Sequence, residues 1–125
     1  MKEDAQIFLQ KAEKDLKIAK SLSIENHDFY EGICFHCQQA AEKYLKAYLI
    51  NNNSELDFTH KINKLLKDCE KLDTDFGELR NININNLTIY AVESRYEEIP
   101  EPSLEDVKDA ISIAEQTKSF VLNKF

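Results

Sequence analysis

Glycine and proline are scarce in this chain, which has two of each among 125 residues. A phosphate-binding loop or a dinucleotide fingerprint needs several glycines within one turn, whereas Gly32 and Gly77 stand far apart. Both motifs are therefore excluded, and we expect no cofactor. Because glycine and proline interrupt regular helices, their scarcity favours long helices joined by short connections.

The sequence also lacks the usual signs of a membrane or secreted protein. No apolar run approaches the roughly 18 residues that suggest a membrane span, and the N-terminus shows no secretory signal. An odd number of cysteines, three, without such a signal favours free thiols in a reducing compartment. We expect a cytoplasmic protein. The net charge of −7 argues against binding duplex DNA through the overall field, although it does not exclude a local basic site.

The chain has the size of one domain, and no linker or repeat divides residues 1–125. Apolar residues recur every three or four positions, which is typical of amphipathic helices. We expect five helices at about residues 4–22, 28–51, 60–73, 87–95 and 103–123. Residues 74–86 fit a short helix and turn better than a strand, because a lone strand has no pairing partner. The predicted fold is all-α, an up-and-down four-helix bundle with one short additional helix.

Polar residues near three of the expected helix starts can satisfy free backbone N–H groups. Asn26 to Asp28 precede the second helix, Thr59 the third and Ser103 the last. Short side chains of these types accept hydrogen bonds from the first turn of a helix. We therefore expect them to act as N-caps.

The helix over 28–51 carries two stripes. One is largely apolar and runs from Tyr30 to Tyr48. The other mixes polar and apolar residues, namely Phe35, Gln38, Glu42, Lys46 and Leu49. A helix with two such stripes typically lies between neighbours or against a partner. We expect a homodimer in which a second copy covers Phe35 and Leu49, with this helix or the helix over 87–95 near the two-fold axis.

Four short motifs follow one another along the chain. The first two are Ala12-Glu13-Lys14-Asp15-Leu16-Lys17-Ile18-Ala19, and Gln38-Gln39-Ala40-Ala41-Glu42-Lys43 with Leu45-Lys46-Ala47. The other two are Thr59-His60-Lys61-Ile62 and Leu87-Thr88-x-Tyr90-Ala91-Val92-x-x-Arg95-Tyr96. Together they resemble the HEPN superfamily, the higher-eukaryote and prokaryote nucleotide-binding domain. The resemblance implies a helical bundle that forms homodimers. It also implies frequent pairing with a small nucleotidyltransferase, as in toxin–antitoxin modules.

Many HEPN proteins are metal-independent ribonucleases that use an arginine followed, after four to six residues, by a histidine. This chain departs from that pattern. Its arginines are Arg80 and Arg95, and its histidines His27, His36 and His60 all come earlier in the sequence. The ribonuclease motif is therefore absent, so we expect no catalytic residue of that type.

The resemblance and the polar stripe together give a set of candidate ligand-binding residues. They are Arg95, Tyr96, His60, Gln38, Gln39, Glu42, Lys43 and Lys46. An arginine can hold a phosphate through paired donors. Each residue also has a structural alternative: Arg95 can satisfy the last carbonyls of its helix, His60 can cap or hydrogen-bond within the core, and the stripe can form an internal network.

Two further patterns favour structural explanations. Cys34 and Cys37 resemble half of a zinc site, but only Cys69 remains to complete it, so we expect no metal. Lys61, Lys64, Lys67 and Lys71 form a basic stripe that is typical of a solvated helix face, with contact to RNA or an acidic partner as the alternative.

The sequence leads to two hypotheses. The first is a non-catalytic HEPN module that binds a nucleotide or substrate and acts with a small nucleotidyltransferase. The second is a divergent metal-independent ribonuclease in which His60 or His36 is the base and Arg95 holds the phosphate. The sequence does not identify the ligand or the partner protein.

Overall fold

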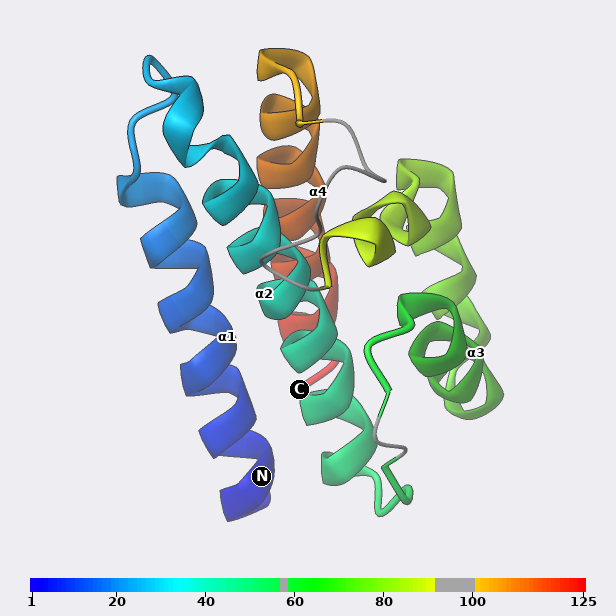
Figure 1. The fold of residues 1–125 in the computed structure, drawn as a ribbon. Helices are drawn as coiled ribbons and strands as arrows, with labels where there is room; N and C mark the ends of the chain where they lie inside the picture. The colour runs from blue at the N-terminus through cyan, green and yellow to red at the C-terminus, as the bar shows by residue number, and fades with distance from the viewer. Residues whose placement is uncertain (57–58, 92–100) are drawn as a thin grey trace.

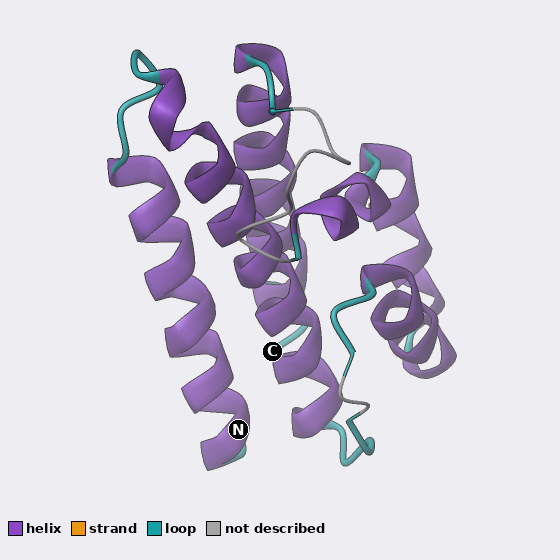
Figure 2. Ribbon diagram, in the orientation of Figure 1, coloured by secondary structure: helices purple, strands orange, loops and turns teal. Residues whose placement is uncertain are grey.

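The computed structural model describes residues 1–56, 59–91 and 101–125. Within these residues, seven helical segments follow one another and no strand occurs (Figures 1 and 2). They are α1 (Glu3–Ser21), η1 (His27–Phe29), α2 (Tyr30–Asn51), α3 (Ile62–Leu72), η2 (Thr74–Ile82), η3 (Ile84–Tyr90) and α4 (Leu104–Leu122), where η denotes a 3₁₀ helix. The all-α prediction is confirmed.

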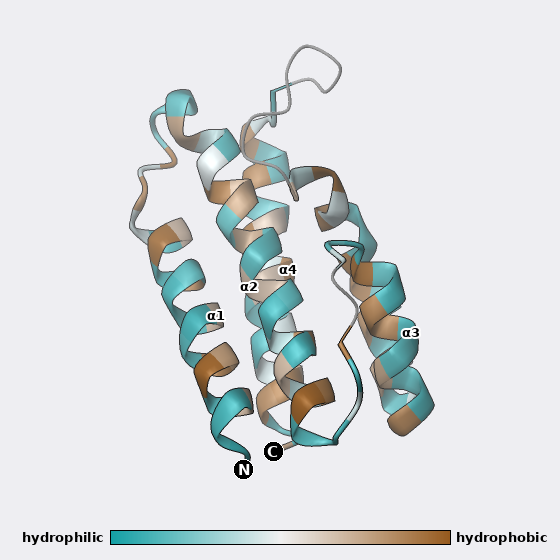
Figure 3. Ribbon diagram, turned by 60° about the horizontal axis from the view of Figure 1, so that its bottom comes forward, coloured by the Kyte–Doolittle hydropathy of each residue, from teal (hydrophilic) through white to brown (hydrophobic). Residues whose placement is uncertain are grey.

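The long helices α1, α2 and α4 lie side by side, with α3, η2 and η3 on the side of α2 away from α1 (Figure 1). Helix α2 packs against α1, α4, α3 and η3. Twelve of its 22 residues are buried, so it is enclosed on several faces rather than along one stripe. Hydrophilic and hydrophobic residues alternate along the helices in Figure 3, as expected of amphipathic helices around a shared core.

Local sequence explains several helix ends. The Ser103 side chain accepts a hydrogen bond from the Asp106 backbone N–H, and the Asp106 carboxylate accepts one from the Ser103 N–H. This capping box starts α4 where the sequence predicts it. Asn26 caps η1, since its side chain accepts a hydrogen bond from the Asp28 N–H. The second predicted helix therefore begins as a 3₁₀ turn.

The prediction for the third helix is wrong at its start. Helix α3 begins at Ile62, and its N-cap is Lys61, without a side-chain cap. The Thr59 hydroxyl instead accepts a hydrogen bond from the Lys61 N–H, which closes a local turn. Residues 59–61 thus precede α3 without regular secondary structure, and this leaves His60 outside the helix.

Residues 74–90 form two 3₁₀ helices. Asn83 joins η2 to η3 in the left-handed conformation, with a φ of 62°, which asparagine tolerates better than most residues. The short helix and turn expected at 74–86 are confirmed. The helix expected at 87–95 begins earlier, at Ile84, and its described part is 3₁₀ rather than α. Residues 92–95 lie outside the described residues.

Leu49 contradicts part of the argument for a dimer. It is fully buried within a single chain, as are Gln38 and, nearly, Glu42. Of the two apolar residues that we expected a second copy to cover, the fold of one chain therefore covers Leu49 and leaves Phe35 half-exposed. Among the described residues, no helix is long and apolar enough to cross a membrane.

Candidate functional site

Glu42 lies near the middle of α2 and is the centre of a buried polar cluster. Its side chain is 4% exposed, and both carboxylate oxygens accept hydrogen bonds. Lys46 Nζ lies 2.9 Å from Oε2, and His60 Nδ1 lies 2.8 Å from Oε1. The Lys46 charge compensates the buried carboxylate, which would otherwise be costly to remove from water. We call Gln38, Gln39, Glu42, Lys46 and His60 the Glu42 cluster.

Gln38 connects the cluster to the approach to α3. Its amide Nε2 donates to Glu42 Oε1 at 3.2 Å and to the backbone carbonyl of His60, also at 3.2 Å. Gln39 Nε2 donates to Gln38 Oε1 at 2.7 Å. Gln38 is fully buried, and a buried amide is stable only when its polar atoms have partners. The amide therefore links α2 to the loop that carries His60.

His60 is the exposed member of the Glu42 cluster. Its side chain is 62% exposed, although Nδ1 contacts the buried carboxylate. Because His60 precedes α3 rather than lying within it, its exposed imidazole can reach Glu42 from outside the bundle. A carboxylate on one ring nitrogen orients the imidazole and leaves the other nitrogen for a ligand. The cluster thus combines a buried ion pair with one accessible titratable group.

Lys43 does not join this cluster. Its Nζ lies 2.5 Å from Asp15 Oδ2, and His36 Nδ1 lies 2.9 Å from Asp15 Oδ1. This second set, the Asp15 cluster, joins α1 to α2. Like the Glu42 cluster, it pairs one largely buried carboxylate with a lysine and with Nδ1 of a histidine. The sequence hypothesis grouped Lys43 with Glu42, but the structure brings it to a different carboxylate.

The sequence analysis did not identify Asp15 as a functional residue. A signal was nevertheless present, because Asp15 falls between Ala12 and Ala19 on the apolar stripe of α1. A carboxylate at such a position needs an internal partner. Its partners lie on α2, so the spacing of residues within α1 cannot predict which residues they are.

The chain has two arginines, and one of them has partners within the fold. Arg95, together with Tyr96, lies outside the described residues. Arg80 is described, and its guanidinium donates to Glu70 and to Asn63 Oδ1, the latter at 2.8 Å. Arg80 therefore stabilises the packing of η2 on α3. Of the two arginines, Arg95 remains the candidate for holding a phosphate.

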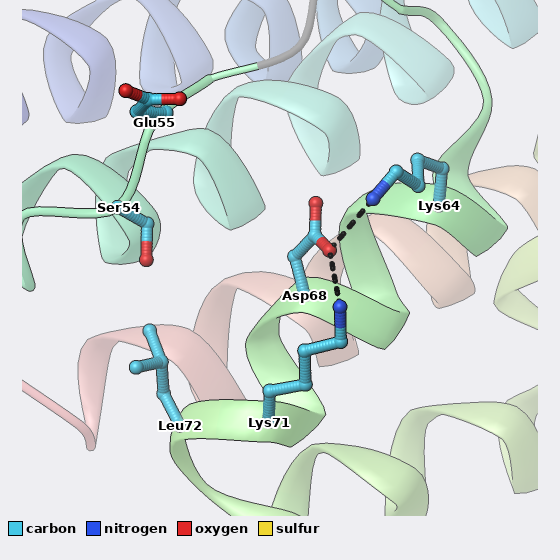
Figure 4. A pocket seen from close by; sticks show the side chains of 6 residues that line it. All are labelled: Ser54, Glu55, Lys64, Asp68, Lys71 and Leu72. Carbon is cyan, nitrogen blue, oxygen red and sulfur yellow. Dashed lines mark hydrogen bonds and ion pairs between the residues drawn. The ribbon is translucent and has the colours of Figure 1, made fainter.

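The basic stripe on α3 is exposed at all four lysines. Asp68 interrupts it, because its Oδ1 lies 2.9 Å from Lys64 Nζ and 3.7 Å from Lys71 Nζ. These three residues line a hollow with Ser54, Glu55 and Leu72 (Figure 4). One carboxylate shared between two lysines reduces the positive charge of this face. A solvated helix face explains the stripe.

The three cysteines are buried and free. Burial raises the pKa of the Cys34 thiol to about 12, and it raises the pKa values of Cys37 and Cys69 as well. These thiols are therefore neutral at physiological pH, which makes them poor nucleophiles and poor metal ligands. Within residues 1–56, 59–91 and 101–125, no group of three or more His, Cys, Asp and Glu side chains could hold a metal ion.

Comparisons with known proteins cover almost the whole chain. The HEPN domain family matches residues 5–124. A protein of Methanocaldococcus jannaschii named "Putative toxin MJ1304" is 31% identical over 140 aligned positions, covering 97% of this chain and 90% of that protein. The crystal structure of ST0689, an archaeal HEPN homologue, has a TM-score of 0.75 at 24% identity and covers 99% of this chain and 98% of its own. That of TT1696 from Thermus thermophilus has a TM-score of 0.77 at 27% identity, with 99% and 100% covered.

Proposed function

The chain belongs to the HEPN domain family, and on that premise we propose that it is a non-catalytic binding module with its site at the Glu42 cluster. The observation that carries this proposal is the exposed His60 imidazole on a buried carboxylate. The buried members of the cluster hydrogen-bond to one another, whereas the His60 imidazole is accessible from solvent. Such an arrangement suits recognition of a polar ligand. The ligand is a nucleotide, or the substrate of a partner enzyme, with Arg95 and Tyr96 as further contacts.

The absence of the ribonuclease motif supports a binding role. Arg80 is held by Glu70 and Asn63, and in the sequence no histidine follows either arginine. The motif that places an acid–base histidine shortly after a phosphate-binding arginine is therefore missing from the sequence. This distinguishes the chain from HEPN ribonucleases that use that motif.

A partner protein completes the proposal. The relative from Methanocaldococcus jannaschii bears the name "Putative toxin MJ1304". We infer that this chain acts in the cytoplasm as the HEPN member of a toxin–antitoxin pair, and that its partner is a small nucleotidyltransferase. The inference draws on the name of that relative and on the genomic pairing that the HEPN resemblance implies.

Calorimetry with nucleotides tests the binding role, first with the protein alone and then with the product of the adjacent gene. We expect binding that His60→Ala weakens at least tenfold. His27→Ala is the matched control, because His27 lies in η1 and is 74% exposed, away from the Glu42 cluster. If neither the protein nor its complex binds any nucleotide, the proposed nucleotide site is wrong.

One observation favours a second function, a divergent metal-independent ribonuclease. The 2.8 Å contact between Glu42 Oε1 and His60 Nδ1 orients an imidazole as a general base requires. Arg95 would hold the phosphate in this case. His36 is a weaker candidate for the base, since only 21% of its side chain is exposed.

Incubation of purified protein with total RNA distinguishes the two functions. A ribonuclease should lose cleavage in both His60→Ala and Arg95→Ala, whereas His27→Ala should retain it. Cleavage that survives both substitutions would point to a contaminant or to another site. A binding module should show no cleavage at all.

A further inference from the structure

The hydrogen bonds of the Glu42 cluster determine where the protons lie. The backbone carbonyl of His60 can only accept a hydrogen bond, so the Gln38 atom 3.2 Å from it must be the amide nitrogen. The Gln39 amide donates to the other end, Gln38 Oε1, at 2.7 Å. The orientation of the buried Gln38 amide is thus fixed from both ends.

This orientation determines the state of Glu42. The Gln38 nitrogen also faces Glu42 Oε1 at 3.2 Å, so Oε1 accepts there. Lys46 Nζ, which can only donate hydrogen bonds, lies 2.9 Å from Oε2. Both oxygens therefore act as acceptors, which is the arrangement of an ionised carboxylate.

His60 must then supply the remaining proton. Its Nδ1 lies 2.8 Å from Glu42 Oε1, and an ionised carboxylate has no proton to give. In the neutral imidazole a proton on Nδ1 leaves Nε2 as an acceptor. Among the described residues Nε2 has no hydrogen-bond partner, and the side chain is 62% exposed.

We propose that Gln38 is the positioning residue of this site and holds His60 with its proton on Nδ1, so that Nε2 accepts a hydrogen bond from a hydroxyl or N–H group of the ligand. The inference rests on the proposed function for the existence of that ligand. It also narrows the ligand chemistry. Nε2 of His60 contacts a sugar hydroxyl or the N–H edge of a base, because an acceptor nitrogen forms no hydrogen bond with an unprotonated phosphate oxygen.

Long-range ¹H–¹⁵N NMR at pH 8, where an ordinary imidazole is neutral, tests the proposal without any ligand. The chain has only three histidines, so each can be assigned. We expect His60 to show the Nδ1–H tautomer in the wild-type protein. In Gln38→Met, which keeps the volume but removes the amide, His60 should show the averaged signals of an unrestrained imidazole. His36, held by Asp15, should not change and serves as the internal control.

Lys46→Met separates positioning from general destabilisation. It removes the contact at Oε2 and lowers stability, but Gln38 and His60 both contact Oε1, so the His60 tautomer should be retained. If Gln38→Met does not fold, Gln39→Leu at a half-exposed position should cause a smaller change of the same kind.

Three results would overturn the proposal. The first is an NMR spectrum in which His60 keeps the Nδ1–H tautomer in every Gln38 and Gln39 variant that folds. The second is a change in Lys46→Met as large as in the Gln38 or Gln39 variant. The third is a shift of the His60 nitrogens on addition of dimethyl phosphate at pH 8, because the phosphate oxygens of that diester carry no proton to donate. A failure of nucleotide binding in calorimetry would instead remove the proposed function and leave the tautomer result standing.

Discussion

At the scale of single residues, Glu42 and Lys46 form an ion pair that is largely removed from water. Their side chains are 4% and 13% exposed, whereas Lys20 and Glu115 form a pair that is 54% and 46% exposed. Removing one member of a buried pair leaves the other without compensation, and this costs more than the pair contributes. Exposed pairs couple by less than about 1 kcal/mol. The two pairs should therefore respond very differently to substitution.

We expect Glu42→Leu to lower the free energy of unfolding by about 3 kcal/mol, because Lys46 is left buried and unpaired. The double variant Glu42→Leu with Lys46→Met should lose clearly less than the sum of the two single variants. Urea unfolding of all four proteins measures this coupling. The Lys20–Glu115 cycle is the control. Equal coupling energies in both cycles would contradict the prediction.

At the scale of elements, Gly32 lies in the first turn of α2 without a conformational need for glycine. The only glycines are Gly32 and Gly77, and neither has a positive φ. A Cβ at Gly32 would lie 3.7 Å from Leu22 Cδ1, an ordinary van der Waals contact. Glycine therefore weakens this helix without a compensating benefit in packing.

Gly32→Ala should raise the free energy of unfolding by about 0.5 kcal/mol, through helix propensity and reduced freedom of the unfolded chain. Gly77→Ala is the matched control. Its Cβ would lie 3.2 Å from Glu70 Oε2, which binds Arg80, so no gain is expected there. Urea unfolding measures both. A loss of stability in Gly32→Ala would show that the α1–α2 contact is tighter than the structure indicates.

The C-terminal end of the chain is tied to the start of η2. Lys124 Nζ lies 2.8 Å from both Asp73 Oδ2 and Asp75 Oδ2, and the Asp73 side chain accepts a hydrogen bond from the Asp75 N–H. The hydrogen bond from Lys124, and then that from the Asp75 backbone, lower the pKa of Asp73 below its ordinary value of 3.8. Asp73 therefore links a helix cap to an ion pair.

Because the pKa of Asp73 is lower in the folded state, its contribution is fully present above about pH 3.8 and is lost as the pH falls through the lowered value. Asp73→Asn keeps a residue that can cap η2 but cannot ionise. We expect the difference in Tm between the wild type and Asp73→Asn to be largest at pH 5 and to shrink towards pH 2.5. Lys124→Met should reproduce the loss at pH 5. Parallel Tm curves for the wild type and Asp73→Asn would contradict the linkage.

At the scale of the whole molecule, α2 retains one half-exposed face despite its central position. Phe35, Gln39, Lys46 and Ile50 lie along this face and are all half-buried. Their spacing of four, seven and four places them on one side of the helix. This face, rather than Leu49, is where a second copy could pack.

The homodimer remains a prediction. A standard interface buries roughly 1,200–2,000 Å² in total. Multi-angle light scattering at micromolar concentration should give about twice the 14.5 kDa chain mass. Phe35→Lys should shift the protein towards the monomer, and Ile7→Lys on the exposed side of α1 should not. A wild-type protein that stays monomeric as concentration rises would end the dimer hypothesis.

The sequence by itself determined the helices and much of one site, because these depend on neighbours along the chain. The capping box at Ser103 and Asp106 and the side chain of Asn26 act within three residues. Gln38, Glu42 and Lys46 come together because residues four apart share a helix face. Residue types at the helix ends and the helical period predict these features, whatever the rest of the fold does.

Only the tertiary structure decided which partners each face meets. His60 reaches Glu42 because α3 starts at Ile62, which leaves His60 in the segment before the helix, where the Gln38 amide binds its carbonyl. Lys43 is one residue from Glu42, yet it turns to Asp15 on α1. Leu49 is buried by its own chain rather than by a second copy. The helical period tells which residues share a face, but the element that covers the face depends on how all the helices pack at once.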